Sequence, residues 1–178
     1  MSMRVIENYL VVLFVFLLCS CGVRNSKTSN IPYVDYSTES IIGSETINVP
    51  FIEQNGVKYV SAKINGVSID MIFDTGCSQT LISLLEAQML AKRGLLTEDD
   101  YQGTTKAAIA DGSIVEDMVF NLRTLELIAG DRTIICNNVL AQVSSNIQAP
   151  VLLGNGVLDR TASYTIDNEN KVIKFKLK

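Results

Sequence analysis

From Val49 onward the chain alternates short apolar runs with polar turns, which is typical of an all-β domain. Several of the polar turns contain Asn-Gly, Asp-Gly or similar dipeptides, which favour the tight turns of β-hairpins. We expect strand breaks at Asn55-Gly56, Asn65-Gly66, Asp111-Gly112, Gly130-Asp131, Asn137-Asn138 and Asn168–Asn170. Short strands at this spacing, with one helix, predict a small closed or nearly closed β-barrel domain.

One segment has a helical pattern. In LISLLEAQMLAKRG, residues 81–94, the residues Leu81, Leu84, Leu85 and Met89 form an apolar stripe, and Gly94 stands where a helix ends. The pattern therefore predicts one main helix in an otherwise β domain. The following Thr97–Asp100 segment is expected to begin a short helical turn.

The first twenty residues have the pattern of a secretory signal. Arg4 precedes an unbroken apolar run from Leu10 to Leu18, which is too short to span a bilayer as a helix. The run ends in LCSC, which resembles the lipobox of bacterial lipoproteins, and by that resemblance Cys21 is the lipidated first residue. The alternative is a plain signal peptide with incidental cysteines.

Composition then divides the rest of the chain. The segment from Gly22 to about Glu45 is rich in Ser, Thr and Asn and has neither a helical nor a strand period, so it is expected to be a flexible tether. We predict a signal peptide at 1–20, a lipidated cysteine and tether at 21–46, and a folded domain at 47–178. The predicted location is the bacterial cell envelope, anchored to a membrane and facing the periplasm.

Charge and composition exclude several classes of function. The chain has 178 residues and a formal net charge of −4, without a Lys/Arg run, so it lacks the basic patch of a nucleic-acid-binding protein. It also has no histidine, which excludes Ser-His-Asp triads, Cys-His pairs and His-containing zinc sites. Hydrolytic chemistry would need carboxylates, hydroxyls, lysine or a hard metal.

A carboxylate stands at the end of one predicted strand. In MIFDTGCSQTLIS, residues 71–83, an apolar run reaches Asp74 and then turns at Gly76. Asp-Thr-Gly is also ordinary turn chemistry, so the motif alone is only suggestive. A second segment, VLLGNG at residues 151–156, repeats the pattern of an apolar strand that reaches a glycine turn and a short helical segment.

Together these segments resemble the retropepsin-like aspartic peptidases, in particular the single-lobed bacterial kind. The resemblance covers roughly Ile47 to Leu177 and includes FDTG (Phe73–Gly76), a flap hairpin AIADGSI (Ala108–Ile114) and LLGNGVL (Leu152–Leu158). It implies an all-β acid-protease fold with one lobe per chain, a peptide or protein substrate and no cofactor or metal. Position 77 departs from the family, since it is usually Ala or Ser and here is Cys.

The resemblance also implies how the catalytic loop works. Such enzymes place two carboxylates about one water, and the pair shares one proton because two close carboxylates cannot both ionise. This chain supplies only Asp74, so a homodimer would have to provide the second copy. In this reading the Thr75 hydroxyl braces the two loops across the dimer, and Gly76 allows close backbone approach. Cys77 completes the active-site loop.

Other residues receive supporting roles from the same resemblance. The flap tip would comprise Ala110, Asp111 and Gly112 and would close over an extended peptide. Leu153 and Gly154 would belong to the strand that threads behind the active-site loop. Whether Cys77 and Cys136 form a disulfide is left open by the sequence.

Three functions are compatible with this sequence. The first is an envelope-anchored aspartic endopeptidase, which the intact Asp-Thr-Gly favours. The second is a catalytically silent retropepsin-like lipoprotein that binds peptides or an envelope partner. The third is a small β-barrel lipoprotein that binds apolar ligands, which predicts no dimer and no role for Asp74.

Overall fold

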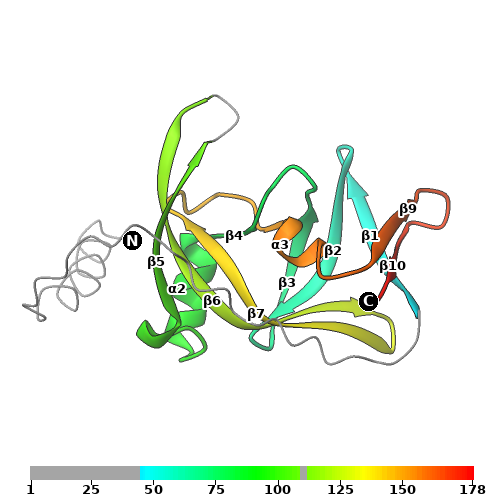
Figure 1. Ribbon diagram of the computed structural model, residues 1–178, viewed down its shortest axis with the longest axis horizontal. Coiled ribbons are helices and arrows are strands. Elements are labelled where there is room, and N and C mark those ends of the chain that lie inside the picture. Colours follow the sequence, from blue (N-terminus) through cyan, green and yellow to red (C-terminus); the bar gives the residue numbers. More distant parts are fainter. Residues whose placement is uncertain (1–44, 109–111) are drawn as a thin grey trace, which may run out of the picture. The chain divides into compact units, whose positions relative to one another are not determined.

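The computed structural model describes residues 45–108 and 112–178, and this part of the chain is mostly β-structure (Figure 1). Its strands are β1 (Thr46–Gln54), β2 (Val57–Ile64), β3 (Val67–Phe73), β4 (Thr80–Ser83), β5 (Tyr101–Ala108), β6 (Ile114–Ala129), β7 (Arg132–Ser144), β8 (Leu152–Leu153), β9 (Ser163–Asp167) and β10 (Val172–Lys176). Its helical segments are α2 (Leu84–Lys92), α3 (Asn155–Leu158) and the 3₁₀ turn η1 (Glu98–Asp100). The expected all-β class, with one main helix, is confirmed.

The strands join into a ring of pairings. Their order is β5-β6-β7-β4-β8-β3-β2-β1-β10-β9, and a further pairing of β6 with β2 connects β2, β3, β8, β4, β7 and β6 in a cycle. Most neighbours are antiparallel, but β3 pairs with β8 and β4 pairs with β7 in parallel. The ring encloses a core of Val, Ile, Leu and Met side chains, among them the fully buried Met71, Leu122 and Leu125.

The predicted hairpins form where glycine and asparagine permit them. Asn55 and Gly56 have φ values of 52° and 78°, and Asn65 and Gly66 have 47° and 83°, so both pairs adopt the left-handed conformation of a two-residue β-turn. The breaks at Gly130-Asp131 and Asn168–Asn170 are confirmed as well, because β6 turns into β7 and β9 turns into β10 there.

The break predicted at Asn137-Asn138 is wrong. Strand β7 continues from Arg132 to Ser144, and its register against β6 is the same on both sides of Asn138. Asn138 does have a positive φ of 51°, so its backbone is locally unusual. The long pairing with β6 holds the strand together, and the Asn121 side chain donates a hydrogen bond to that of Asn138. Tertiary pairing therefore overrides the local turn preference.

The helix prediction is correct in its end and wrong in its start. Gly94 has a positive φ of 68° and follows the C-cap Arg93, as expected. However, Leu81 lies in β4, and the helix begins only after Ser83, whose hydroxyl accepts hydrogen bonds from the backbone N–H groups of Leu85 and Glu86. The predicted stripe is also wrong, because Ala87 and Leu90 are buried while Leu85 is exposed.

The last two strands extend the sheet beyond the ring. Strand β10 pairs with the first half of β1, and β9 pairs with β10. Aromatic side chains connect this extension to β3, the strand that leads to Asp74: Phe73 makes T-shaped contacts with Tyr164 and Phe175 at centroid distances of 5.3 Å and 6.4 Å. The C-terminal hairpin of β9 and β10 therefore packs against the last residue of β3.

Candidate active site

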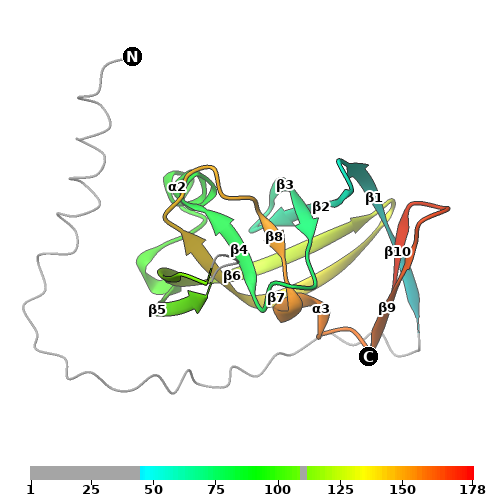
Figure 2. The ribbon, with the colours of Figure 1, turned by 90° about the horizontal axis from the view of Figure 1, so that it is seen from above.

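Asp74 is the first residue after β3, and two flanking segments fix its position. Strand β3 runs parallel to β8, with Ile72 opposite Leu152 and Phe73 opposite Leu153, and β8 in turn pairs with β4 (Figure 2). The backbone N–H of Asp74 donates to the carbonyl of Leu153 at 3.1 Å. Because β3 and β8 are central strands of the ring, the Asp74 backbone is held on a rigid part of the fold.

The loop after Asp74 folds back onto its carboxylate. The backbone N–H of Gly76 donates to Asp74 Oδ1 at 2.9 Å, and that of Cys77 approaches the Asp74 carbonyl at 3.4 Å. A Cβ on Gly76 would lie 3.2 Å from Asp74 Oδ1, which is a tight contact. Without a Cβ, Gly76 leaves room for this close approach of its backbone to the carboxylate.

Gly154 lies directly behind this loop. A Cβ at Gly154 would be 2.1 Å from the carbonyl oxygen of Gln79 and 2.7 Å from that of Cys77, so only glycine fits here. Next to it, the N–H groups of Asn155 and Gly156 donate to the carbonyls of Cys77 and Ser78 at 2.9 Å and 3.0 Å. The segment after β8 thus supports the outer part of the Asp74 loop through backbone hydrogen bonds.

The loop presents two groups outward. Thr75 is exposed, and within residues 45–108 and 112–178 its hydroxyl makes no hydrogen bond. Asp74 is partly exposed, and no second carboxyl group of the described chain is hydrogen-bonded to it. At this loop, the described part of one chain therefore presents the oriented carboxylate of Asp74 and, beside it, the Thr75 hydroxyl without a hydrogen bond.

The flap prediction falls partly outside the described residues. Ala110 and Asp111 lie there, and so nothing is established about them. The two arms are confirmed, because β5 pairs with β6 from Tyr101/Phe120 to Ala108/Ile114, and this hairpin projects beyond β7 (Figure 1). Gly112 is exposed with a φ of 84°, which a β-hairpin tip requires and glycine readily adopts.

Comparison with known proteins now places the chain. The family model described as "gag-polyprotein putative aspartyl protease" matches residues 60–160, more than half of the sequence. The chain belongs to this aspartyl protease family. A solved structure of a retropepsin-like aspartic protease from Rickettsia conorii is 19% identical, with a TM-score of 0.50, and the match covers 75% of this chain and 90% of that one. That likeness establishes the fold. No curated protein matches.

Asn155 supports the Asp74 loop, and this role was not predicted from the sequence. The side chain of Asn155 donates through Nδ2 to the carbonyl of Thr75 at 3.0 Å. Residues 75 and 155 are far apart in sequence, and GNG predicts only a turn, so nothing in the local pattern identifies this contact.

The two cysteines of the described domain are free thiols. Burial raises the pKa of Cys77; a hydrogen bond with the Gln79 backbone partly opposes this, and the nearby charge of Asp74 adds to it. Burial likewise raises the pKa of Cys136. Both groups are therefore held as neutral thiols at neutral pH, and the thiol form is a poor nucleophile.

We expect Cys77 to be dispensable for catalysis but sensitive to bulky adducts. Cys77→Ser keeps a small donor for the Gln79 carbonyl and should retain activity. In the native chain, alkylation of Cys77 at neutral pH should be at least about tenfold slower than in the unfolded chain and should block activity once complete. Peptide mapping by mass spectrometry separates Cys77 from the other cysteines. Loss of activity in Cys77→Ser with an unchanged melting temperature would show a catalytic role for the thiol.

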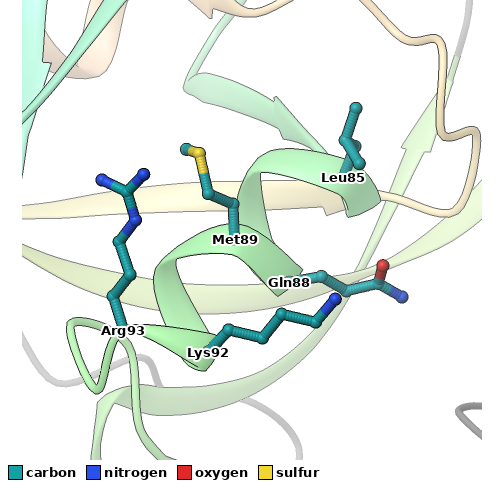
Figure 3. Close-up of a pocket in the computed structure, with 5 residues that line it drawn as sticks. All are labelled: Leu85, Gln88, Met89, Lys92 and Arg93. Atoms are coloured by element: carbon teal, nitrogen blue, oxygen red, sulfur yellow. The ribbon is translucent and has the colours of Figure 1, made fainter.

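A separate surface hollow lies on the outer face of α2. Leu85, Gln88, Met89, Lys92 and Arg93 line it, and all five belong to α2 or its C-cap (Figure 3). No carboxylate lines the hollow, and neither Asp74 nor its loop contributes to it. Nor does the described part of the chain hold a group of three His, Cys, Asp or Glu side chains suited to a metal ion.

Proposed function

We propose that this chain is an aspartic endopeptidase whose active site forms between two copies. The observation that carries the proposal is the orientation of Asp74, whose Oδ1 accepts the Gly76 N–H while its loop is held against β8 and Gly154. A protein that only packs or binds through this region has no need for a partly exposed carboxylate fixed at a strand end. Membership of an aspartyl protease family supports the same chemistry.

The chemistry needs two Asp74 carboxylates about one water. One carboxylate, ionised, removes a proton from the water as it attacks the peptide carbonyl, while the other, protonated, donates a hydrogen bond to the developing oxyanion. The proton then passes to the leaving nitrogen as the C–N bond breaks. No cofactor enters this scheme.

The homodimer is part of the proposal. Each chain carries one Asp-Thr-Gly, and a twofold axis beside the loop would place Asp74 opposite its copy. Thr75 supports this arrangement, because its exposed side chain makes no hydrogen bond within the described chain and is free to contact the partner loop. Pairing on a membrane surface would be favoured by the high effective concentration of tethered chains.

The substrate is proposed to be an extended peptide with apolar side chains near the cleaved bond. Ile72, Leu152 and Leu81 lie in register across β3, β8 and β4, and all three are only partly buried. Ile72 precedes Asp74 by two residues, so the row begins next to the carboxylate on the same side of the strand. The projecting β5–β6 hairpin supplies a cover, with Ile114 of β6 72% exposed.

A peptide-library assay tests the proposal against its alternative, a silent peptide-binding lipoprotein. The purified full-length chain is incubated with a mixed-sequence library from pH 3 to pH 8, and the products are sequenced by mass spectrometry. We expect cleavage at apolar positions under acidic to neutral conditions, with none by Asp74→Asn. Binding of library peptides by both proteins without any cleavage would instead establish the silent binding module.

We propose that the chain is anchored in the bacterial cell envelope through Cys21. The support is the sequence LCSC after the apolar run of residues 10–18. In the described part of the chain, no helix has the length and apolar character required to cross a bilayer. In this proposal the lipid on Cys21 attaches the chain to the membrane.

Replacement of Cys21 tests the anchor. We expect Cys21→Ser to move the protein from the membrane fraction to the soluble fraction and to abolish incorporation of labelled palmitate, because the thioether site is lost. Cys19→Ser is the matched control and should change neither, since residue 19 would be removed with the signal. Membrane attachment that survives Cys21→Ser would contradict the lipoprotein assignment.

A further inference from the structure

One peptide group connects Asn155 to the Asp74 carboxylate. The peptide between Thr75 and Gly76 donates its N–H to Asp74 Oδ1 at 2.9 Å. The carbonyl of the same peptide accepts a hydrogen bond from Asn155 Nδ2 at 3.0 Å. Hydrogen bonds therefore hold this peptide group on both its N–H side and its carbonyl side. The acceptor on the N–H side is the Asp74 carboxylate itself.

Asn155 lies in a segment that is itself fixed, so its side chain can restrain the Thr75–Gly76 peptide. Its own N–H is bonded to the Cys77 carbonyl at 2.9 Å, and it is the first residue of α3. Arg160, just after α3, donates to the carbonyls of Gly156 and Asn138 at 3.1 Å and 2.9 Å, so α3 is tied to β7. The amide of Asn155 therefore comes from a segment fixed on two sides.

A hydrogen bond accepted by a peptide carbonyl polarises the whole peptide group and strengthens its N–H as a donor. A stronger donor stabilises the ionised form of the carboxylate that accepts it. We infer that Asn155 is a positioning residue of the active site, which acts through the Thr75–Gly76 peptide to orient Asp74 and to favour its ionised form. The inference deepens the proposed peptidase function and rests on it for its effect on rate.

The effect of Asn155 on the Asp74 carboxylate can be measured at acidic pH, because the described groups around Asp74 in its own chain do not titrate there. The titratable group that faces it from its own loop is the Cys77 thiol, which burial keeps neutral there. Strand β8 contributes only Leu152 and Leu153, and α3 contains no charged residue. In the proposed dimer the other titrating group is the Asp74 of the second copy.

The test compares Asn155→Leu, which keeps similar volume without a donor, with the wild type. We expect kcat to fall about fivefold with little change in KM, because one neutral hydrogen bond is removed. The acidic limb of the pH–rate profile should move to higher pH by about half a unit. Asn155→Ala also removes the donor to the Thr75 carbonyl without adding a charge beside Asp74, and it serves if Asn155→Leu does not fold.

A second measurement does not depend on catalysis. The amide proton of Gly76, followed by NMR as pH is varied, reports its hydrogen bond to Asp74 directly. We expect its titration midpoint to move to higher pH in Asn155→Leu. Asn170→Leu is the matched control, because it removes an amide hydrogen bond to Asp167 in the β9–β10 turn, outside the Asp74 loop and α3, and should leave both the Gly76 titration and the pH–rate profile unchanged.

The outcomes separate the two proposals. A shifted Gly76 titration in a protein that cleaves nothing would support the role of Asn155 and contradict the peptidase function. An unshifted Gly76 titration and an unshifted acidic limb, with only a lower melting temperature, would overturn the inference and leave Asn155 a purely structural residue.

Discussion

Asp74→Asn should reduce the cleavage rate by at least about 10²–10⁴-fold while leaving the fold intact. The amide oxygen of asparagine can accept the Gly76 N–H as Asp74 Oδ1 does, and asparagine has nearly the same volume. What it cannot do is remove a proton from water. Stability should be unchanged or slightly higher, because two facing carboxylates repel each other when ionised.

The measurement is cleavage rate and melting temperature for both proteins across pH. The wild-type rate should fall toward high pH as the shared proton of the pair is lost, since the second carboxyl then no longer donates to the oxyanion. Mixing adds a test of the dimer: an equal amount of Asp74→Asn chain should lower wild-type activity by about half, because random exchange produces mixed dimers. Equal cleavage by wild type and mutant would exclude the peptidase mechanism.

Local turn chemistry made much of the fold predictable. The Asn-Gly dipeptides at 55–56 and 65–66 fix two hairpins because both residues must adopt positive φ, and few other residues do so readily. Those turns set the register that brings β3 to its end at Asp74. The retropepsin-like fold followed because the Asp-Thr-Gly and the Leu-Leu-Gly segments occur in the right order.

Other features depend on contacts that no local pattern records. Residues 81–83 are apolar or small and suit a helix or a strand equally, so only the parallel pairing of β4 with β7 decides that they are extended. The capping geometry of Ser83 then starts the helix three residues later than its apolar period suggests. At Asn138 the pairing with β6 overrides a turn preference in the same way.

In the candidate site, too, residues of a local motif were predictable and a residue that acts through a long-range contact was not. Asp74, Thr75 and Gly76 were predicted because they form one motif, and the structure shows the glycine N–H bonded to the carboxylate. Asn155 was not predicted, because its role depends on a contact across 80 positions of sequence. Sequence patterns therefore identified the Asp74 carboxylate as the candidate reacting group, but they did not identify Asn155, whose side chain holds the Thr75–Gly76 peptide.

Two glycines two residues apart provide the sharpest test of how the Asp74 loop is supported. At Gly154 an added Cβ would lie 2.1 Å from the carbonyl oxygen of Gln79 and 2.7 Å from that of Cys77. At Gly156 the nearest atoms to an added Cβ are Gln79 Cα at 3.7 Å and the Ser78 carbonyl oxygen at 3.8 Å, which are ordinary contacts. The same substitution should therefore have opposite outcomes at the two positions.

Gly154→Ala should destabilise the protein by about 3 kcal/mol or more and abolish activity, because the atoms in its way are backbone and cannot rotate aside. Either β8 moves away from β3, which breaks the hydrogen bond from Asp74 N–H to Leu153, or the Asp74 loop moves outward. Gly156→Ala should change stability by no more than about 0.5 kcal/mol and keep its activity. Urea unfolding and cleavage rate of the two variants, measured side by side, decide the point. Equal stability and activity of Gly154→Ala and Gly156→Ala would mean that the segment after β8 does not support the loop as closely as the 2.1 Å approach requires.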